Sequence, residues 1–145
     1  MNFIAKNFSE LSLTELYEIL KARSQIFIVE QNMHCQDIDG IDQKARHFFI
    51  EEDGNILAYL RAFYENESKN VVRIGRVLSI THGVGLGADI MRKAIEDIKK
   101  NMKCKKICLD SQKHAIGFYE KLGFKTVSSE FLEEGVIHVR MEFLI

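Results

Sequence analysis

The sequence contains neither proline nor tryptophan, and only three of its 145 residues are cysteine. A small, odd number of cysteines argues against a disulfide framework and favours a reducing compartment, the cytoplasm. The formal net charge of −1 lacks the basic surplus that nucleic-acid binding requires. No apolar run is long enough to span a membrane, and residues 1–6 lack the layout of a signal peptide. We therefore expect one cytoplasmic domain over residues 1–145, with neither nucleic acid nor membrane as a partner.

Hydrophobic periodicity predicts strands and helices in a mixed order. Residues 12–15 have the form of a capping box, with a hydroxyl before the helix and a carboxylate three residues on. Turn signals at 53–55 and 133–135 predict two hairpins. The full pattern predicts strands at 3–8, 47–51, 56–64, 71–80, 106–110, 124–132 and 136–143, and helices at 12–23, 85–101 and 115–122. Antiparallel hairpins around a βαβ core indicate an α+β protein whose ligand crevice lies where the strand order changes.

A glycine-rich stretch, His-Gly-Val-Gly-Leu-Gly at 82–87, lies between a predicted strand and a predicted helix. Glycines let the backbone approach a pyrophosphate, and the N–H groups and dipole of a helix start favour an anion. Gly83–Ala88 also fits the fingerprint of NAD-type dinucleotide sites, with Asp110 near the end of the next strand as a ribose ligand. That fingerprint usually opens a fold, whereas about eighty residues precede it here. Taken alone, the stretch fits either cofactor type or a plain turn.

A second motif, Phe-Tyr-Glu-Lys-Leu-Gly-Phe at 118–124, follows about thirty residues later. The two motifs together resemble those of the GNAT superfamily of N-acetyltransferases, over nearly the whole chain. The chain also resembles the ElaA-like branch of that family, in the stretches 27–31, 36–40, 46–47, 74–77 and 137–141. The resemblance implies a GNAT-like, mostly antiparallel twisted sheet of six to seven strands with about four helices, splayed at the strand that holds the cofactor.

The resemblance implies that an acetyl group passes directly from acetyl-CoA to an amine in a ternary complex. Tyr119 is then the expected general acid, because its phenol can donate to the departing thiolate. Backbone N–H groups around Leu78 and Ser79 would polarise the carbonyl. The implied cofactor-binding residues are Val77, Leu78, Ser79, His82, Gly83, Val84, Gly85, Leu86, Gly87, Ala88, Gln112, Phe118 and Tyr119. His82 stands where the family has Arg or Gln, so the hold on pyrophosphate rests mainly on backbone N–H groups.

The base that deprotonates the amine is less well defined by the sequence. Glu30, His47 and His138 are candidates for the base or for a substrate contact, because each falls in a stretch that resembles the ElaA-like branch. Histidine titrates near neutral pH, which suits the role, although a chain of water molecules would also serve. The residues alone do not choose among them.

The segment around Asp37, Asp39 and Asp42 is acidic and also contains His34 and Cys35. Its spacing matches neither a calcium loop nor a zinc site, so we expect a polar loop without a metal, whose carboxylates draw in a cationic amine. Two other functions stay open, an NAD-type protein using Gly83–Ala88 and a non-catalytic CoA-binding regulator. The acceptor amine and the oligomeric state are also open, with a homodimer as one option.

Overall fold

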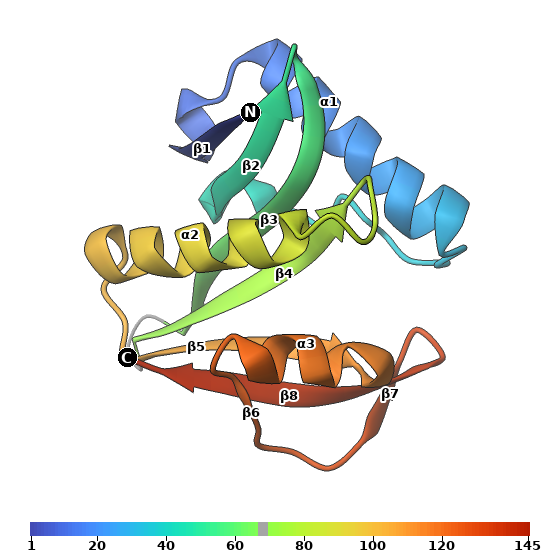
Figure 1. The fold of residues 1–145 in the computed structure, drawn as a ribbon, viewed down its shortest axis with the longest axis vertical. Coiled ribbons are helices and arrows are strands. Elements are labelled where there is room, and N and C mark those ends of the chain that lie inside the picture. Colours follow the sequence, from blue (N-terminus) through green and yellow to red (C-terminus); the bar gives the residue numbers. More distant parts are fainter. Residues whose placement is uncertain (67–69) are drawn as a thin grey trace.

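The computed structural model describes residues 1–66 and 70–145. Their strands form one sheet in the order β1-β2-β3-β4-β5-β8-β6, with β7 also paired to β8 (Figure 1). The elements are β1 (Asn2–Asn7), α1 (Leu13–Arg23), β2 (Arg46–Glu52), β3 (Asn55–Asn66), β4 (Val71–Ser79), α2 (Leu86–Asn101), β5 (Lys106–Gln112), α3 (Ile116–Lys121), β6 (Lys125–Thr126), β7 (Phe131–Glu133) and β8 (Val136–Leu144). This α+β architecture confirms the predicted fold class. None of the helices described here is long and apolar enough to cross a membrane.

The capping box and the first hairpin turn form where the sequence predicts them. Ser12 Oγ accepts a hydrogen bond from the Glu15 N–H at 3.0 Å, and the Glu15 carboxylate accepts one from the Ser12 N–H at 2.8 Å, so the capping box starts α1. Asp53 and Gly54 both have positive φ, at 52° and 80°. A two-residue turn of this kind has the twist that antiparallel strands need, and it joins β2 to β3.

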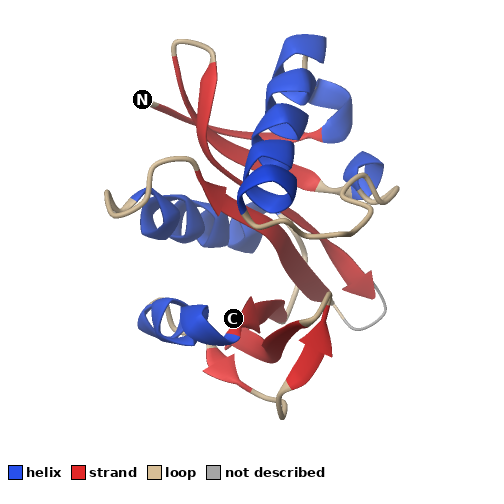
Figure 2. Ribbon diagram, turned by 90° about the vertical axis from the view of Figure 1, so that its right-hand side faces the viewer, coloured by secondary structure: helices blue, strands red, loops and turns tan. Residues whose placement is uncertain are grey.

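The two faces of the sheet are covered by different helices. Along β2, Phe48 packs with α2 while its neighbour Phe49 packs with α1, because successive side chains point to opposite faces. Figure 2 shows α2 and α3 one above the other on one side of the strands. The buried stripe of α2 is Leu86, Ile90, Met91, Ala94, Ile95 and Ile98. Helices α2 and α3 therefore cover the same face of the sheet, and α1 covers part of the other face.

The sheet splits between β4 and β5. These strands run parallel, but they pair only from Val71–Arg73 to Lys106–Cys108, whereas β5 stays paired with β8 over its whole length. Beyond Arg73, β4 turns away from β5 towards the start of α2 (Figure 1). The predicted splay at the cofactor strand is therefore present, and it leaves one backbone edge of β4 without a neighbouring strand.

The structure differs from the expectation in its element counts. The described residues form eight strands and three α-helices, compared with the expected six to seven strands and about four helices. The predicted strand at 124–132 is interrupted because the Ser128 hydroxyl accepts from the Arg140 N–H at 2.8 Å, in place of a backbone acceptor. Beyond Arg23 the first helix continues as a π-helix over Ser24–Glu30.

Candidate active site

The glycine loop, residues 82–88, joins β4 to α2 and presents an exposed helix start. Gly83 and Gly85 each have a φ of 80°, and a Cβ at either position would meet no atom within 4 Å. Glycine is therefore needed at both positions for the backbone conformation and not for space. Gly85 is the residue before α2, and its carbonyl accepts the first helical hydrogen bond from Asp89. The N–H groups of 86–88 have no helical acceptor, so they form an anion-binding helix start.

The two sequence motifs are packed against each other. Gly87 lies in the first turn of α2, and a Cβ there would be 3.5 Å from Cζ of Phe118 in α3. The rings of Phe118 and Tyr119 meet edge to face with their centroids 5.0 Å apart, and Tyr119 meets Phe124 in the same way at 5.9 Å. Phe118 thus ties the glycine loop to the helix that carries Tyr119.

A cavity of about 610 Å³ lies beside the split in the sheet. It is bounded by the split strands, by the hairpin of β7 and β8, and by the chain between α1 and β2. The sequence-predicted site residues that line it are Val77, Gln112, Tyr119 and His138. A pocket between strand ends of a split sheet, with convergent polar groups, has the character of a binding site.

Tyr119 lines this cavity and is almost completely buried. Its exposed fraction is 9%, and burial raises the pKa of its phenol to about 12. The hydroxyl has no hydrogen-bond partner in the described part of the chain, and Tyr119 itself lines the cavity. The phenol therefore stays protonated at neutral pH and is free to donate a hydrogen bond to a bound molecule.

His138 lies on β8 opposite Gln112 of β5, with its ring held in one orientation. Its Nδ1 is 2.8 Å from the carbonyl oxygen of Val136, which can only accept, so Nδ1 carries the proton. Nε2 then presents a lone pair, with a Glu133 carboxylate oxygen 3.6 Å away. Phe131 stacks on the ring. This arrangement suits a group that accepts a proton from a ligand in the cavity.

His47 is not brought to the cavity. The side chain is fully buried beneath α1, where Nε2 donates to the Asp42 carbonyl at 2.9 Å and Nδ1 accepts from the Tyr59 hydroxyl at 2.7 Å. Burial, together with the charges of nearby arginines, lowers the pKa of His47. Both ring nitrogens are used within the core, which corrects the prediction of His47 as a base or substrate contact.

Glu30 lies at the end of the π-helix and contacts the glycine loop, not the cavity. A Glu30 carboxylate oxygen is 3.0 Å from Nε2 of His82, and both side chains are substantially exposed. The structure thus brings together two predicted residues that had been given different roles. Glu30 is not among the residues that line the cavity, so its role as a base stays a prediction.

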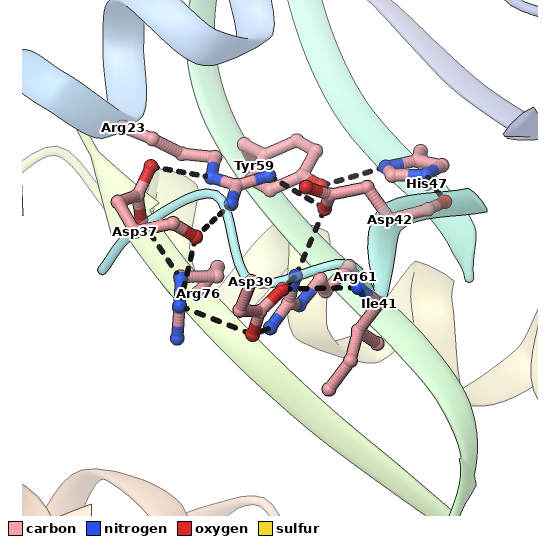
Figure 3. A network of polar contacts seen from close by, with 9 residues as sticks. All are labelled: Arg23, Asp37, Asp39, Ile41, Asp42, His47, Tyr59, Arg61 and Arg76. Atoms are coloured by element: carbon pink, nitrogen blue, oxygen red, sulfur yellow. Dashed lines mark hydrogen bonds and ion pairs between the residues drawn. The ribbon is translucent and has the colours of Figure 1, made fainter. Parts of the chain in front are cut away.

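The aspartate loop, residues 35–42, forms one wall of the cavity and is fastened to the sheet by arginines (Figure 3). Each aspartate of the loop bonds to two of three guanidinium groups. The shortest bond to each aspartate carboxylate is Arg76 Nε to Asp37 at 2.9 Å, Arg61 Nη2 to Asp39 at 2.6 Å and Arg23 Nη1 to Asp42 at 2.7 Å. The side chains of Arg23 and Arg61 are 0% and 3% exposed.

These contacts bear on the expectation that the aspartates draw in a cationic amine, because each carboxylate already has guanidinium partners. Burial alone would raise the pKa of Asp39, but hydrogen bonds from Arg61 and the backbone of Ile41, with nearby guanidinium charges, lower it to about 2. Three carboxylates face three guanidinium groups, so the network carries no net charge to offer a ligand. No group of residues suited to a metal ion is found in the described ranges.

The arginines of this network are the site residues that the sequence reasoning missed. Arg61 interrupts the apolar run of β3, and Arg23 lies on the buried side of the first helix with Ile19 and Ile26. A charged residue in an apolar run implies a buried charge that needs a partner. That signal could have predicted that the aspartates pair with the arginines.

The split sheet and the glycine-rich helix start together define the fold class of the acyltransferases. A family model described as the acetyltransferase (GNAT) domain matches residues 9–145, so the chain belongs to the GNAT acetyltransferase family. Asp110, the ribose ligand of the NAD-type alternative, is paired with Arg73 inside the split. Family membership and this pairing both argue against that alternative.

Relatives place the chain near ElaA within the family. Protein ElaA of Escherichia coli is 34% identical over 137 residues, which cover 92% of this chain and 90% of ElaA. A UPF0039 protein of Schizosaccharomyces pombe is 35% identical, with 97% of this chain and 95% of that protein covered. The E. coli ElaA structure matches with a TM-score of 0.91 at 32% identity, covering 98% of both chains. An acyl-CoA N-acyltransferase from Pseudomonas aeruginosa matches with a TM-score of 0.92 at 32% identity, covering 99% of both. The predicted ElaA-like resemblance is confirmed.

Proposed function

We propose that the protein is an acetyl-CoA-dependent N-acetyltransferase that passes the acetyl group directly to an amine in a ternary complex. The observation that carries the proposal is the position of the split between β4 and β5. The glycine loop begins at the end of β4, and the cavity with Tyr119 and His138 adjoins the same split. One molecule can therefore bind the glycine loop with its phosphates while its reactive end reaches the cavity.

The residues present fit coenzyme A. The pyrophosphate would lie on the N–H groups at the start of α2, where no side chain of Gly83 or Gly85 intervenes. His82 would lie beside it, and Phe118 and Gln112 would adjoin the arm that leads to the thioester. The neighbour from P. aeruginosa is described as an acyl-CoA N-acyltransferase, which supports a CoA thioester as donor and nitrogen as acceptor.

Three groups of this chain would act on the reacting atoms. Nε2 of His138 takes the proton that the amine loses as its nitrogen attacks the thioester carbon. Of the backbone N–H groups around Leu78 and Ser79, that of Ser79 points to the open edge of β4, because the next N–H, that of Ile80, donates to Leu57 on the other side. The Ser79 N–H donates to the carbonyl oxygen. The Ser79 hydroxyl is occupied, because it donates to the Thr81 carbonyl at 2.9 Å. Tyr119 donates to the sulfur as the carbon–sulfur bond breaks, so the thiolate leaves protonated or hydrogen-bonded.

The high pKa of Tyr119 defines how it would act. An ordinary thiol has a pKa near 8.5, so full proton transfer from a phenol at about 12 is uphill by about 5 kcal/mol. A hydrogen bond to the developing thiolate is therefore the expected contribution. Because the phenol is neutral well above physiological pH, activity should show no loss from Tyr119 ionisation up to about pH 10.

Release of free thiol from acetyl-CoA tests the proposal, measured with peptides, lysine, polyamines and amino sugars as acceptors. We expect turnover with at least one amine, and a kcat about 100-fold lower in Tyr119→Phe. Tyr17→Phe is the matched control, because Tyr17 is 70% exposed on α1. CoA binding without turnover of any amine would favour the regulator instead. A Tyr119→Phe enzyme as active as the control at every pH would remove Tyr119 as the acid.

A further inference from the structure

Arg76 holds a backbone conformation that its own side chain disfavours. Its φ is 55°, in the left-handed region, although it lies within β4. In the pairing with β3, Tyr59 faces Leu78 and Arg61 faces Gly75, so Leu60 alone faces both Arg76 and Val77. This is a β-bulge, with one extra residue on β4. A non-glycine residue in this region is strained, and it persists only where surrounding contacts hold it.

The contacts that hold Arg76 come from the aspartate loop. Its Nε donates to Asp37 Oδ1 at 2.9 Å, and its Nη2 donates to the Asp37 carbonyl at 3.0 Å and to Asp39 Oδ2 at 3.3 Å. Figure 3 shows the guanidinium directed from β4 onto the loop. Three bonds to two aspartates hold this side chain on the side of the sheet that carries the aspartate loop.

The aspartates are themselves fixed, so they form a rigid anchor. Arg23 donates to the Asp37 carboxylate at 3.2 Å and to its carbonyl at 2.8 Å, and Arg61 donates to both carboxylate oxygens of Asp39 at 2.9 and 2.6 Å. The two arginines are buried. A loop held in this way cannot follow Arg76 if the backbone relaxes to a negative φ, so relaxation would break the three bonds.

The bulge lies where its shape matters for the reaction. Val77 and Leu78 directly follow Arg76, beyond the point at which β4 parts from β5. An extra residue in a strand reverses the side to which the next backbone groups point. The φ of Arg76 therefore decides which of the N–H groups after it face the open edge of β4.

We propose that Arg76 is a positioning residue, whose bonds to Asp37 and Asp39 hold the β4 bulge so that the backbone N–H of Ser79, on the open edge of β4, faces the thioester carbonyl. The aspartate loop, which forms one wall of the cavity, thereby also fixes the edge of β4 that polarises the carbonyl. The inference rests on the proposed acyl transfer, because it assigns a cause to the direction of the donors that the transfer needs.

A matched pair of substitutions separates positioning from simple contact with a substrate. Arg76→Ala and Arg76→Gly both remove the guanidinium from the cavity, so they lose any substrate contact equally. They differ in the backbone, because glycine adopts a φ near 55° freely and alanine does not. We expect kcat about tenfold lower in Arg76→Ala than in Arg76→Gly, with the KM for acetyl-CoA the same in both. Equal kcat values in the two variants would overturn the proposal.

A second pair covers the case in which the alanine variant does not fold. Arg76→Asn and Arg76→Gln carry the same amide group, but asparagine tolerates the left-handed region and glutamine does not. The Asn variant should keep the higher kcat of this pair as well. A Gln variant as active as the Asn variant contradicts the positioning role.

Amide NMR signals of Val77 and Leu78 provide a readout that needs no turnover. They should stay close to the wild-type positions in Arg76→Gly and move in Arg76→Ala. If the wild-type protein releases no thiol with any amine, the proposed function fails, while these signals still decide the inference about the bulge. Wild-type signals in Arg76→Ala would show that Arg76 does not hold the bulge.

Discussion

The glycine loop and the aspartate loop both adjoin β4, but they are built in different ways. The glycine loop depends on backbone conformation, with Gly83 and Gly85 at positive φ and no side chain needed to hold them. The aspartate loop depends on side chains that arrive from α1, β3 and β4. The first presents unsatisfied N–H groups to a ligand, whereas the second satisfies its charges internally. One is therefore suited to binding, and the other to holding shape.

The largest effect is expected from removing an arginine under the aspartate loop. Arg23→Ala leaves Asp42 buried beside one guanidinium instead of two and should lower the free energy of unfolding by about 3–5 kcal/mol. Urea unfolding measures it, and the affinity of the folded protein for CoA should not change. Arg92→Ala, whose pair with Asp89 is exposed on α2, should cost at most about 0.5 kcal/mol. Equal losses in the two variants contradict the structural role of the network.

A smaller effect is expected from a substitution in the glycine loop, and the property that it changes is CoA binding. Gly85→Ala meets no atom but forces alanine to a φ of 80°, which costs about 1–2 kcal/mol. We expect about tenfold weaker CoA binding by calorimetry, because the strained turn relaxes and redirects the N–H groups. Gly117→Ala, at an open position in α3, is the matched control and should bind CoA as the wild type does. Unchanged affinity in Gly85→Ala would move the pyrophosphate site elsewhere.

The smallest effect is expected on stability in acid. It tests the difference between the charged aspartate loop and the uncharged glycine loop. The pKa of Asp39 is lowered to about 2, so its ion pairs stabilise the folded protein above about pH 4 and are lost as the pH falls towards 2. Wild type should lose about 1 kcal/mol over this range that Asp39→Asn does not lose, a figure reduced for solvent screening at this partly exposed loop. The control is Asp53→Asn in the exposed β2–β3 turn, which should keep the wild-type pH profile. Parallel profiles for wild type and Asp39→Asn would show that the pairs contribute nothing.

The same contrast explains what could be predicted from the sequence. The glycine loop, the capping box at Ser12 and the β2–β3 turn are set by residues within a few positions of each other, so their signals are visible in the chain. Tyr119 was proposed as the acid because its motif resembles that of the family. The aspartate network joins residues 14, 19 and 39 positions apart, and only the folded sheet brings them together.

Two histidines show the same limit of prediction from the sequence. His47 and His138 both lie on strands, and nothing adjacent to either in the sequence separates them. Burial under α1 takes His47 into the core, while the β5–β8 pairing places His138 at the cavity. The sequence therefore offers His138 as one of three candidate bases, and the structure is what favours it over His47.

Ligand-dependent stability is the most direct test that the glycine loop and the split form a coenzyme A site. Unfolding of the wild-type protein is measured with CoA, with NAD and with neither. At a CoA concentration 100 times its Kd, the free energy of unfolding should rise by about 2.7 kcal/mol, and NAD should leave it unchanged. Stabilisation by NAD without stabilisation by CoA would contradict the account.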